Sequence, residues 1–129
     1  MTVPNTHLAI SPSLVGTPVE LSPNRAVAQL VTRQEMCADD AGLVHGGFAF
    51  GLADYAAMLA VNDPFVVLGS AESRFLAPVR CGELMMATAE VVEEQGKKRQ
   101  VDCRITVGDR VVFEGRFICF VLPRHVLDQ

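Results

Sequence analysis

The chain has 129 residues, of which 50% are hydrophobic and 20% are charged, and this composition excludes an intrinsically disordered protein. The net charge of −4 and the pI near 5.3 argue against a nucleic-acid partner, which needs clustered Lys and Arg side chains. No uncharged apolar stretch reaches the roughly 20 residues that cross a bilayer, and the N-terminus lacks a signal-peptide pattern. We therefore expect a cytoplasmic protein with no membrane partner and one domain, residues 1–129, in which residues 1–13 form an irregular segment.

The first predicted elements are two strands and a long helix. Residues 17–21 and 25–33 predict a hairpin around the turn pair Pro23-Asn24. Residues 42–63 predict a helix of about four turns, apolar on nearly every side. Asp39-Asp40 would suit its positive end, and Asn62-Asp63-Pro64 would end it.

After the helix the hydrophobic period changes to two, which is typical of antiparallel strands with one solvated face. Residues 65–79 predict a long strand that Pro78 blocks, and residues 84–93 predict another strand that ends at Gln95-Gly96. Two alternating runs follow on either side of Gly108-Asp109, which predicts a two-residue hairpin turn. The inward positions of these runs are Val101, Cys103, Ile105 and Val107, then Val111, Phe113, Phe117, Cys119 and Val121.

The four cysteines form no CxxC pair, and no His stands at a metal-ligand spacing from them. Cys103 and Cys119 fall at inward positions of predicted strands, so we expect small core residues. The sequence therefore predicts neither a metal nor another cofactor.

One carboxylate, Asp54, lies in the middle of the apolar helix. Its helical neighbours three, four and seven positions away carry no charge that would offset it. An isolated buried carboxylate costs several kcal/mol or becomes neutral. Asp54 therefore indicates either a partner element that supplies hydrogen bonds or a carboxylate that does chemistry.

The element order, two strands, one helix and four strands, predicts an α+β fold. A helix that is apolar all round needs a strongly curved antiparallel sheet of about five to six strands wrapped around it. One sheet edge then stays open, and a second subunit would cover it and the rest of the helix. We therefore expect a homodimer, with a dimer of dimers as a further possibility.

The pair His45-Gly46-Gly47 and Leu52-Ala53-Asp54, with Asp54 nine positions after His45, resembles the signature of hot-dog acyl-CoA thioesterases of the phenylacetate-degradation (PaaI-like) type. The segment Phe75-Leu76-Ala77-Pro78 with Gly82-Glu83 resembles the strand that follows the helix in that family. The resemblance spans residues 14–122 and implies the hot-dog fold. The chain also resembles hot-dog proteins that bind acyl-CoA for regulation, such as the ligand domain of FapR.

The thioesterase resemblance implies roles for four residues of the helix. Gly46 and Gly47 at its N-terminus would present N–H groups to a developing oxyanion, Asp54 would act as nucleophile or general base, and His45 would hold the carbonyl or orient Asp54 of the partner subunit. Structural alternatives remain for each: glycines that only turn the chain, a carboxylate held by donors of a facing strand, and a capping histidine. Tyr55 stands where many such thioesterases have Thr or Ser, and we expect it to pack.

The same resemblance implies acyl-CoA as substrate. Arg and Lys side chains are suited to the CoA phosphates, and the candidates are Arg74, Arg80, Lys97, Lys98 and Arg99. The acyl pocket would lie along the helix, with candidates Phe48, Phe50, Met58 and Phe75, although core packing explains them equally well. Two functions therefore remain possible from the sequence: acyl-CoA hydrolysis, and acyl-CoA binding without turnover. A hydratase of this fold would need a different His-centred loop, which is absent from the sequence.

Overall fold

The computed structural model describes residues 2–129 and confirms the predicted order of two strands, one long helix and four strands. The elements in chain order are the helix α1 (Pro12–Val15), the strands β1 (Thr17–Ser22) and β2 (Arg25–Val31), the 3-10 turn η1 (Gln34–Met36), the helix α2 (Gly46–Val61), the strands β3 (Val66–Phe75), β4 (Leu84–Gln95), β5 (Lys98–Val107) and β6 (Arg110–Val121), and the 3-10 turn η2 (Val126–Asp128).

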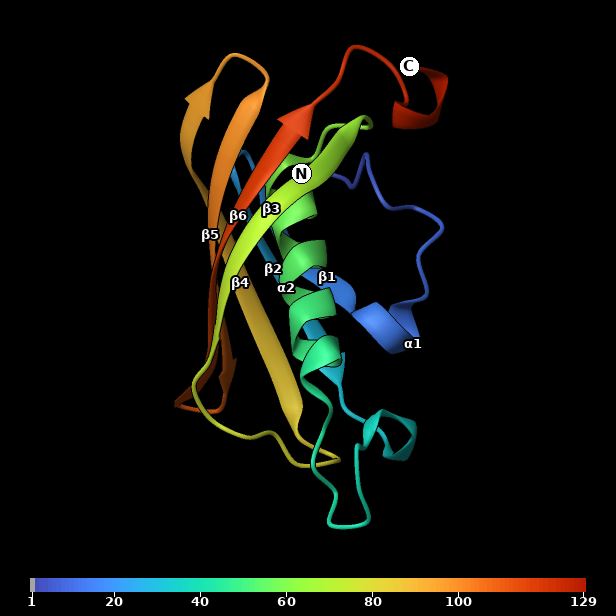
Figure 1. Ribbon diagram of the computed structural model, residues 1–129, viewed down its shortest axis with the longest axis vertical. Coiled ribbons are helices and arrows are strands. Elements are labelled where there is room, and N and C mark those ends of the chain that lie inside the picture. Colours follow the sequence, from blue (N-terminus) through green and yellow to red (C-terminus); the bar gives the residue numbers. More distant parts are fainter. Residues whose placement is uncertain (1) are drawn as a thin grey trace.

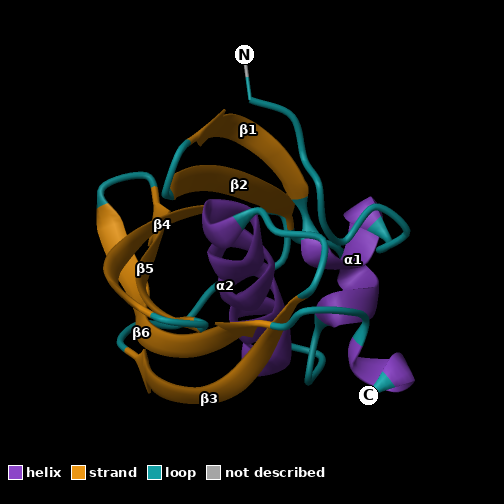
Figure 2. Ribbon diagram, turned by 90° about the horizontal axis from the view of Figure 1, so that it is seen from above, coloured by secondary structure: helices purple, strands orange, loops and turns teal. Residues whose placement is uncertain are grey.

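All six strands form one antiparallel sheet in the order β1-β2-β4-β5-β6-β3. The sheet curves around α2 and encloses it on most sides, as the view along the helix shows (Figure 2). This is the hot-dog fold that the sequence predicted. Neither α2 nor any other helix within residues 2–129 is long and apolar enough to cross a membrane.

Small side chains bring the helix close to the sheet. Cys103 and Cys119 are buried core residues, as the alternating pattern predicted. Because alanine ends at Cβ, its backbone can approach a neighbouring element closely, and α2 packs densely against the sheet. The fully buried alanines at this contact are Ala53, Ala56 and Ala57 on α2, Ala26 and Ala28 on β2, and Ala87 and Ala89 on β4.

The N-terminal segment covers part of the helix that the sheet leaves free. Asn62 ends α2 in the left-handed conformation, with φ 54°, and its N–H donates to Met58 O at 2.8 Å. Its side-chain amide also donates to Val3 O at 2.9 Å and accepts from the Asn5 N–H at 2.7 Å. Asn62 is therefore the helix stop that the sequence predicted and also fastens residues 2–11 to the helix, a second role that the sequence did not reveal.

The helix begins four residues later than predicted, at Gly46 instead of position 42. Residues 42–44 are extended, because the Val44 N–H donates to Val79 O at 2.9 Å and the Leu43 carbonyl accepts from the Ala38 N–H at 2.8 Å. The expectation that Asp39 lies at the helix start was also wrong. Its carboxylate instead accepts from the N–H groups of Ala41 and Leu43, at 3.0 and 3.2 Å, and closes the turn before this segment.

Two strand details also differ from the predictions. The strand predicted to reach position 79 ends at Phe75, and residues 76–83 form a loop. Val111 was expected to point inward, but a bulge opposite Ile105 and Thr106 shifts the register of β6. The bulge buries Val112, which is 2% exposed, and this residue becomes part of the wall of the cavity described below.

The strand β3 forms an open edge of the sheet, since within residues 2–129 it pairs only with β6. Beside this edge, α2 carries a stripe of incompletely buried positions at helical spacing, which includes Phe50 and Asp54. The N-terminal segment and the sheet cover the rest of the helix, so one chain covers more of α2 than the apolar pattern of its sequence predicted. What remains uncovered within residues 2–129 is the β3 edge, the opposite edge at β1 and the side of the helix that carries Asp54.

Candidate active site

Asp54 lies in the middle of α2 and is the one described side chain with a buried polar atom that has no partner, its Oδ1. The side chain is only partly buried. Burial raises the pKa of its carboxyl from the ordinary value of 3.8 to about 6. On β6, burial and then the nearby Asp54 carboxylate raise the pKa of the Cys119 thiol to about 12. No Arg, Lys or backbone donor of a facing strand holds Asp54 within the described chain. The alternative that Asp54 is a structural carboxylate bound by such donors therefore finds no support within residues 2–129.

The start of α2 presents two N–H groups with different surroundings. The Gly47 N–H donates to the imidazole Nδ1 of His45 at 2.9 Å, so His45 caps the helix through its side chain. The Gly46 N–H finds no acceptor within the described chain. Because Nδ1 accepts, the neutral imidazole carries its proton on Nε2 and can donate a hydrogen bond from there.

Gly46 is closely packed against a neighbouring aromatic ring. A Cβ added to Gly46 would lie 3.1 Å from the ring of Phe75, closer than a side chain can approach without displacing the ring. The ring of Phe75 in turn packs edge-on against Phe113, with ring centroids 5.2 Å apart. Phe113 is fully buried, so the core of the sheet supports one wall of the helix start.

A cavity of about 350 Å³ opens beside the helix start. Its volume is in the range of small-molecule sites. Apart from His45 its lining is apolar, which suits a hydrocarbon group rather than a charged one. Three of the lining residues, His45, Gly46 and Phe75, were predicted as site residues. The others were not predicted as site residues, and they are Leu43, Val44, Ala49, Leu76, Ala77, Pro78, Val79 and Val112.

The other predicted pocket residues lie elsewhere. Met58 is 1% exposed and belongs to the core. Phe50 packs on Phe117, with ring centroids 5.6 Å apart, and Phe48 packs edge-on against His45 at 6.5 Å. The structure therefore brings only Phe75 of the four predicted residues to the cavity. Tyr55 is buried and lies 6.2 Å from the ring of His7 in the N-terminal segment, so it packs as expected.

Comparison with known proteins identifies the family. Residues 41–114, which include the helix start, Asp54 and most of the cavity wall, match the model of the thioesterase superfamily. The chain belongs to this superfamily. A crystal structure of an uncharacterized protein, PH1136 from Pyrococcus horikoshii, shares 50% of its sequence, with a TM-score of 0.97 and 98% of each chain covered.

The predicted resemblance to PaaI-like and FapR-like members of the thioesterase superfamily is confirmed. A structure of a mutant form of the phenylacetic acid degradation protein PaaI from Thermus thermophilus is 26% identical, with a TM-score of 0.78, covering 84% of this chain and 95% of that one. Transcription factor FapR of Caldanaerobacter subterraneus is 27% identical over 105 residues, 81% of this chain and 52% of its own length. A protein of Aquifex aeolicus named methylthioribose-1-phosphate isomerase is 48% identical over 117 residues, 91% of this chain but only 26% of its own length.

Two catalytic candidates of this thioesterase-superfamily chain are too far apart to act on one carbonyl within one protomer. Gly46 and Asp54 are eight residues apart on α2, which corresponds to about 12 Å along the helix axis. A thioester whose oxygen meets the Gly46 N–H therefore cannot reach Asp54 of the same helix. If both groups act, they must come from two subunits.

The basic candidates lie at opposite ends of the sheet instead of forming one cluster. Lys98 pairs with Phe120, and Phe120 pairs with Val67 at the beginning of β3, whereas Arg80 follows the end of β3. A strand of ten residues spans about 30 Å, and Figure 1 shows the β4–β5 turn at the end of the sheet away from the start of α2. Within a single chain, Arg80 and the turn that carries Lys97, Lys98 and Arg99 therefore lie at different ends of the sheet.

Proposed function

We propose that this member of the thioesterase superfamily is an acyl-CoA thioesterase that hydrolyses its substrate without a metal, at sites shared between two subunits. The observation that carries the proposal is Asp54, a partly buried carboxylate with an unpartnered oxygen and a pKa raised to about 6. Such a group is well suited to general-base catalysis near neutral pH. The unpartnered Gly46 N–H beside an apolar cavity supports the same proposal.

In the proposed reaction the thioester carbonyl accepts a hydrogen bond from Gly46 at the positive end of α2. The His45 imidazole can donate a second one through Nε2. Asp54 of the partner subunit takes a proton from a water molecule, whose oxygen attacks the carbonyl carbon. The tetrahedral intermediate then collapses, the C–S bond breaks, and the proton held by Asp54 passes to the CoA sulfur. The products are the free acid and CoA.

A second candidate function is acyl-CoA binding without turnover, which the similarity to FapR favours. Asp54 discriminates between the two, because a protein that only binds gains nothing from an unpaired carboxylate at the centre of its helix. The test is a panel of acyl-CoA substrates of different chain length, monitored by release of the free thiol. Binding of acyl-CoA without thiol release from any of them would favour the sensor.

The pH dependence of hydrolysis follows from the raised pKa. A general base must be deprotonated, so kcat/KM should fall roughly tenfold for each pH unit below the pKa of Asp54, which is about 6, and should level off above it. The measurement is kcat/KM between pH 4.5 and 8.5, over the range in which the protein stays folded. A profile that is flat from pH 5 to 8 would contradict Asp54 as the base.

We also expect no folded monomer at micromolar concentration. The open edge of β3 and the uncovered side of α2 both need a second copy to exclude water. Exposed apolar side chains lie near this region, among them Phe65, Phe75 and Leu76. Sedimentation velocity across a concentration series would check this, and a single species at 13.9 kDa would refute both the oligomer and the shared site.

A further inference from the structure

Most arginines of the described chain form a salt bridge with a neighbouring carboxylate. The few that do not are the arginines best able to bind a phosphate. Three exposed arginines have no carboxylate within salt-bridge distance inside residues 2–129, namely Arg74, Arg80 and Arg124. The candidate Arg99 is already bound, since its guanidinium contacts Glu94 at 2.7 Å and Gly96 O at 2.6 Å.

Two of the three free arginines are less well placed for a ligand in the cavity. Arg74 precedes the cavity residue Phe75, but successive side chains of a strand point to opposite faces, and Arg74 borders a separate hollow together with Glu72 and Glu114. Arg124 follows β6, whose last residue, Val121, pairs with Val66 at the other end of the sheet. Arg80 follows Pro78 and Val79, which both line the cavity, and it is not among the residues of the acidic hollow that Arg74 borders.

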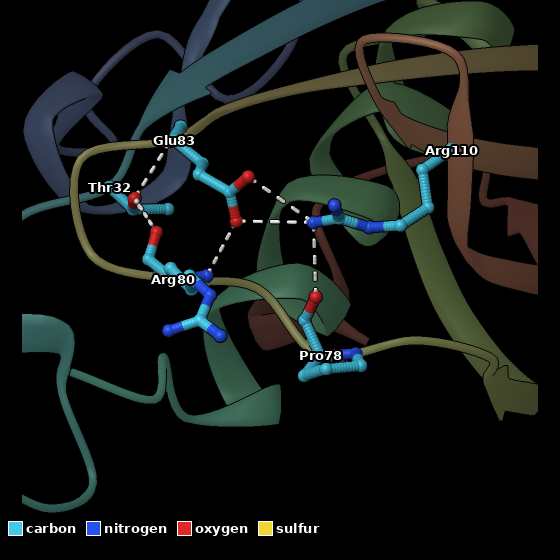
Figure 3. A network of polar contacts seen from close by, with 5 residues as sticks. All are labelled: Thr32, Pro78, Arg80, Glu83 and Arg110. Atoms are coloured by element: carbon cyan, nitrogen blue, oxygen red, sulfur yellow. Dashed lines mark hydrogen bonds and ion pairs between the residues drawn. The ribbon is translucent and has the colours of Figure 1, made fainter. Parts of the chain in front are cut away.

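A network of polar contacts holds the loop that carries Arg80 (Figure 3). The buried hydroxyl of Thr32 lies 2.7 Å from Glu83 O and 3.1 Å from Arg80 O. The Arg80 N–H donates to the Glu83 carboxylate at 2.7 Å. The guanidinium of Arg110 contacts both Glu83 oxygens, at 3.1 and 3.3 Å, and Pro78 O at 3.2 Å.

These contacts keep Glu83 charged and leave the side chain of Arg80 free. The hydrogen bond from the Arg80 backbone, and then the charges of Arg110 and, more weakly, of Arg80 itself, lower the pKa of the Glu83 carboxyl. Every contact of Arg80 in the network uses its backbone, and its guanidinium points away from Glu83 and Arg110 (Figure 3). The loop is therefore fixed while the cationic group it presents remains available for a ligand.

The same loop is joined to the start of α2. Arg80 forms a β-bridge with Leu43, two residues before the capping His45. The Val44 N–H donates to Val79 O at 2.9 Å. The backbone of Arg80 is consequently tied to the segment that leads into the helix start, next to residues that line the apolar cavity. In CoA the pantetheine arm separates the thioester from the phosphates, so a phosphate-binding cation is expected at such a margin rather than at the cavity floor.

We infer that Arg80 binds a phosphate group of CoA and that Thr32, Glu83 and Arg110 are the positioning residues that hold its loop. The inference rests on the proposed function for the choice of ligand. A guanidinium binds phosphate through two parallel hydrogen bonds and retains its charge at any working pH. In a chain of net charge −4, an anionic ligand also needs a local cation that is not already neutralised.

The test compares Arg80→Gln with Arg124→Gln, which removes the same charge from an equally unpaired arginine at the other end of the sheet. Titration calorimetry with CoA itself should show affinity about tenfold weaker for Arg80→Gln, the loss of one charge-assisted pair, and unchanged for Arg124→Gln. Wild-type affinity should also fall as salt rises, with a shallower dependence in Arg80→Gln. Glu83→Gln, which loosens the loop but keeps Arg80, should give an intermediate loss.

Kinetics separate this inference from the proposed function. With acyl-CoA as substrate, Arg80→Gln should raise KM about tenfold and leave kcat unchanged. Acyl-pantetheine has no phosphate, so wild type and Arg80→Gln should hydrolyse it with the same KM and kcat. Arg80-dependent CoA binding without any hydrolysis would overturn the proposed function and support the inference. Hydrolysis with the same KM in wild type and Arg80→Gln, or a wild type that does not bind CoA, would overturn the inference.

Discussion

Asp54→Asn is expected to lower acyl-CoA hydrolysis by about 100-fold or more, the loss that removal of a general base causes, while acyl-CoA still binds. Asparagine keeps the size of the side chain, so the packing of α2 is preserved, but it can neither accept a proton from water nor attack the carbonyl. The measurement pairs thiol release with binding of a non-hydrolysable acyl-CoA analogue, for wild type and variant. The control is Asp109→Asn, which removes the same charge from the exposed β5–β6 turn.

The same variant should be more stable than wild type at neutral pH. Burial raises the pKa of Asp54 to about 6 in the folded protein, from 3.8, so the folded state binds the proton more tightly than the unfolded state. Wild-type stability therefore falls as pH rises from about 4 to 6, on the order of 2 kcal/mol, and Asp54→Asn lacks this loss. Melting temperatures of wild type and Asp54→Asn at pH 4 and pH 7 check this, because the variant should gain stability relative to wild type as the pH rises. Turnover of the variant near the wild-type rate would refute the catalytic role, whatever its stability.

Much of the fold could be predicted because the sequence changes its hydrophobic period at the end of the helix. Strict alternation placed Cys103 and Cys119 in the core correctly, and Gly108 occupies the two-residue turn with φ 58°. The helix start could not be located, since an apolar run such as residues 42–44 is compatible with either a strand or a helix. Only the hydrogen bonds to two neighbouring segments make it extended.

The candidate site could be predicted in part from the same hydrophobic pattern. Asp54 was recognisable because a single charge interrupts an apolar periodic segment. The cavity was not, because its wall combines the loop after β3 with Val112, which a bulge displaces by one position. The end of the sheet at which a basic residue lies was also not predictable, because it depends on where each strand stops and turns back. Arg80 is distinguished from the other basic residues only by contacts between segments far apart in the chain.

Mixing two inactive variants is expected to restore activity if the site is shared. Gly46→Val would place its side chain against the ring of Phe75, which lies 3.1 Å from an added Cβ, and would block the approach of a thioester to the helix start. This variant and Asp54→Asn should each lose hydrolysis by about 100-fold or more. In a hetero-oligomer, one of every two sites combines the intact Gly46 of one subunit with the intact Asp54 of the other.

Equal amounts of the two variants, refolded together, should therefore recover about a quarter of the wild-type activity, since random pairing in a two-fold symmetric dimer makes half of the dimers mixed. The measurement is thiol release from the mixture and from each variant refolded alone, with different affinity tags to confirm that mixed oligomers form. Circular dichroism and melting temperatures show that each variant folds. A mixture that contains tagged hetero-oligomers and stays inactive would refute the shared site. The Gly46 and Asp54 groups, about 12 Å apart on one helix, would then have to act on different parts of the substrate.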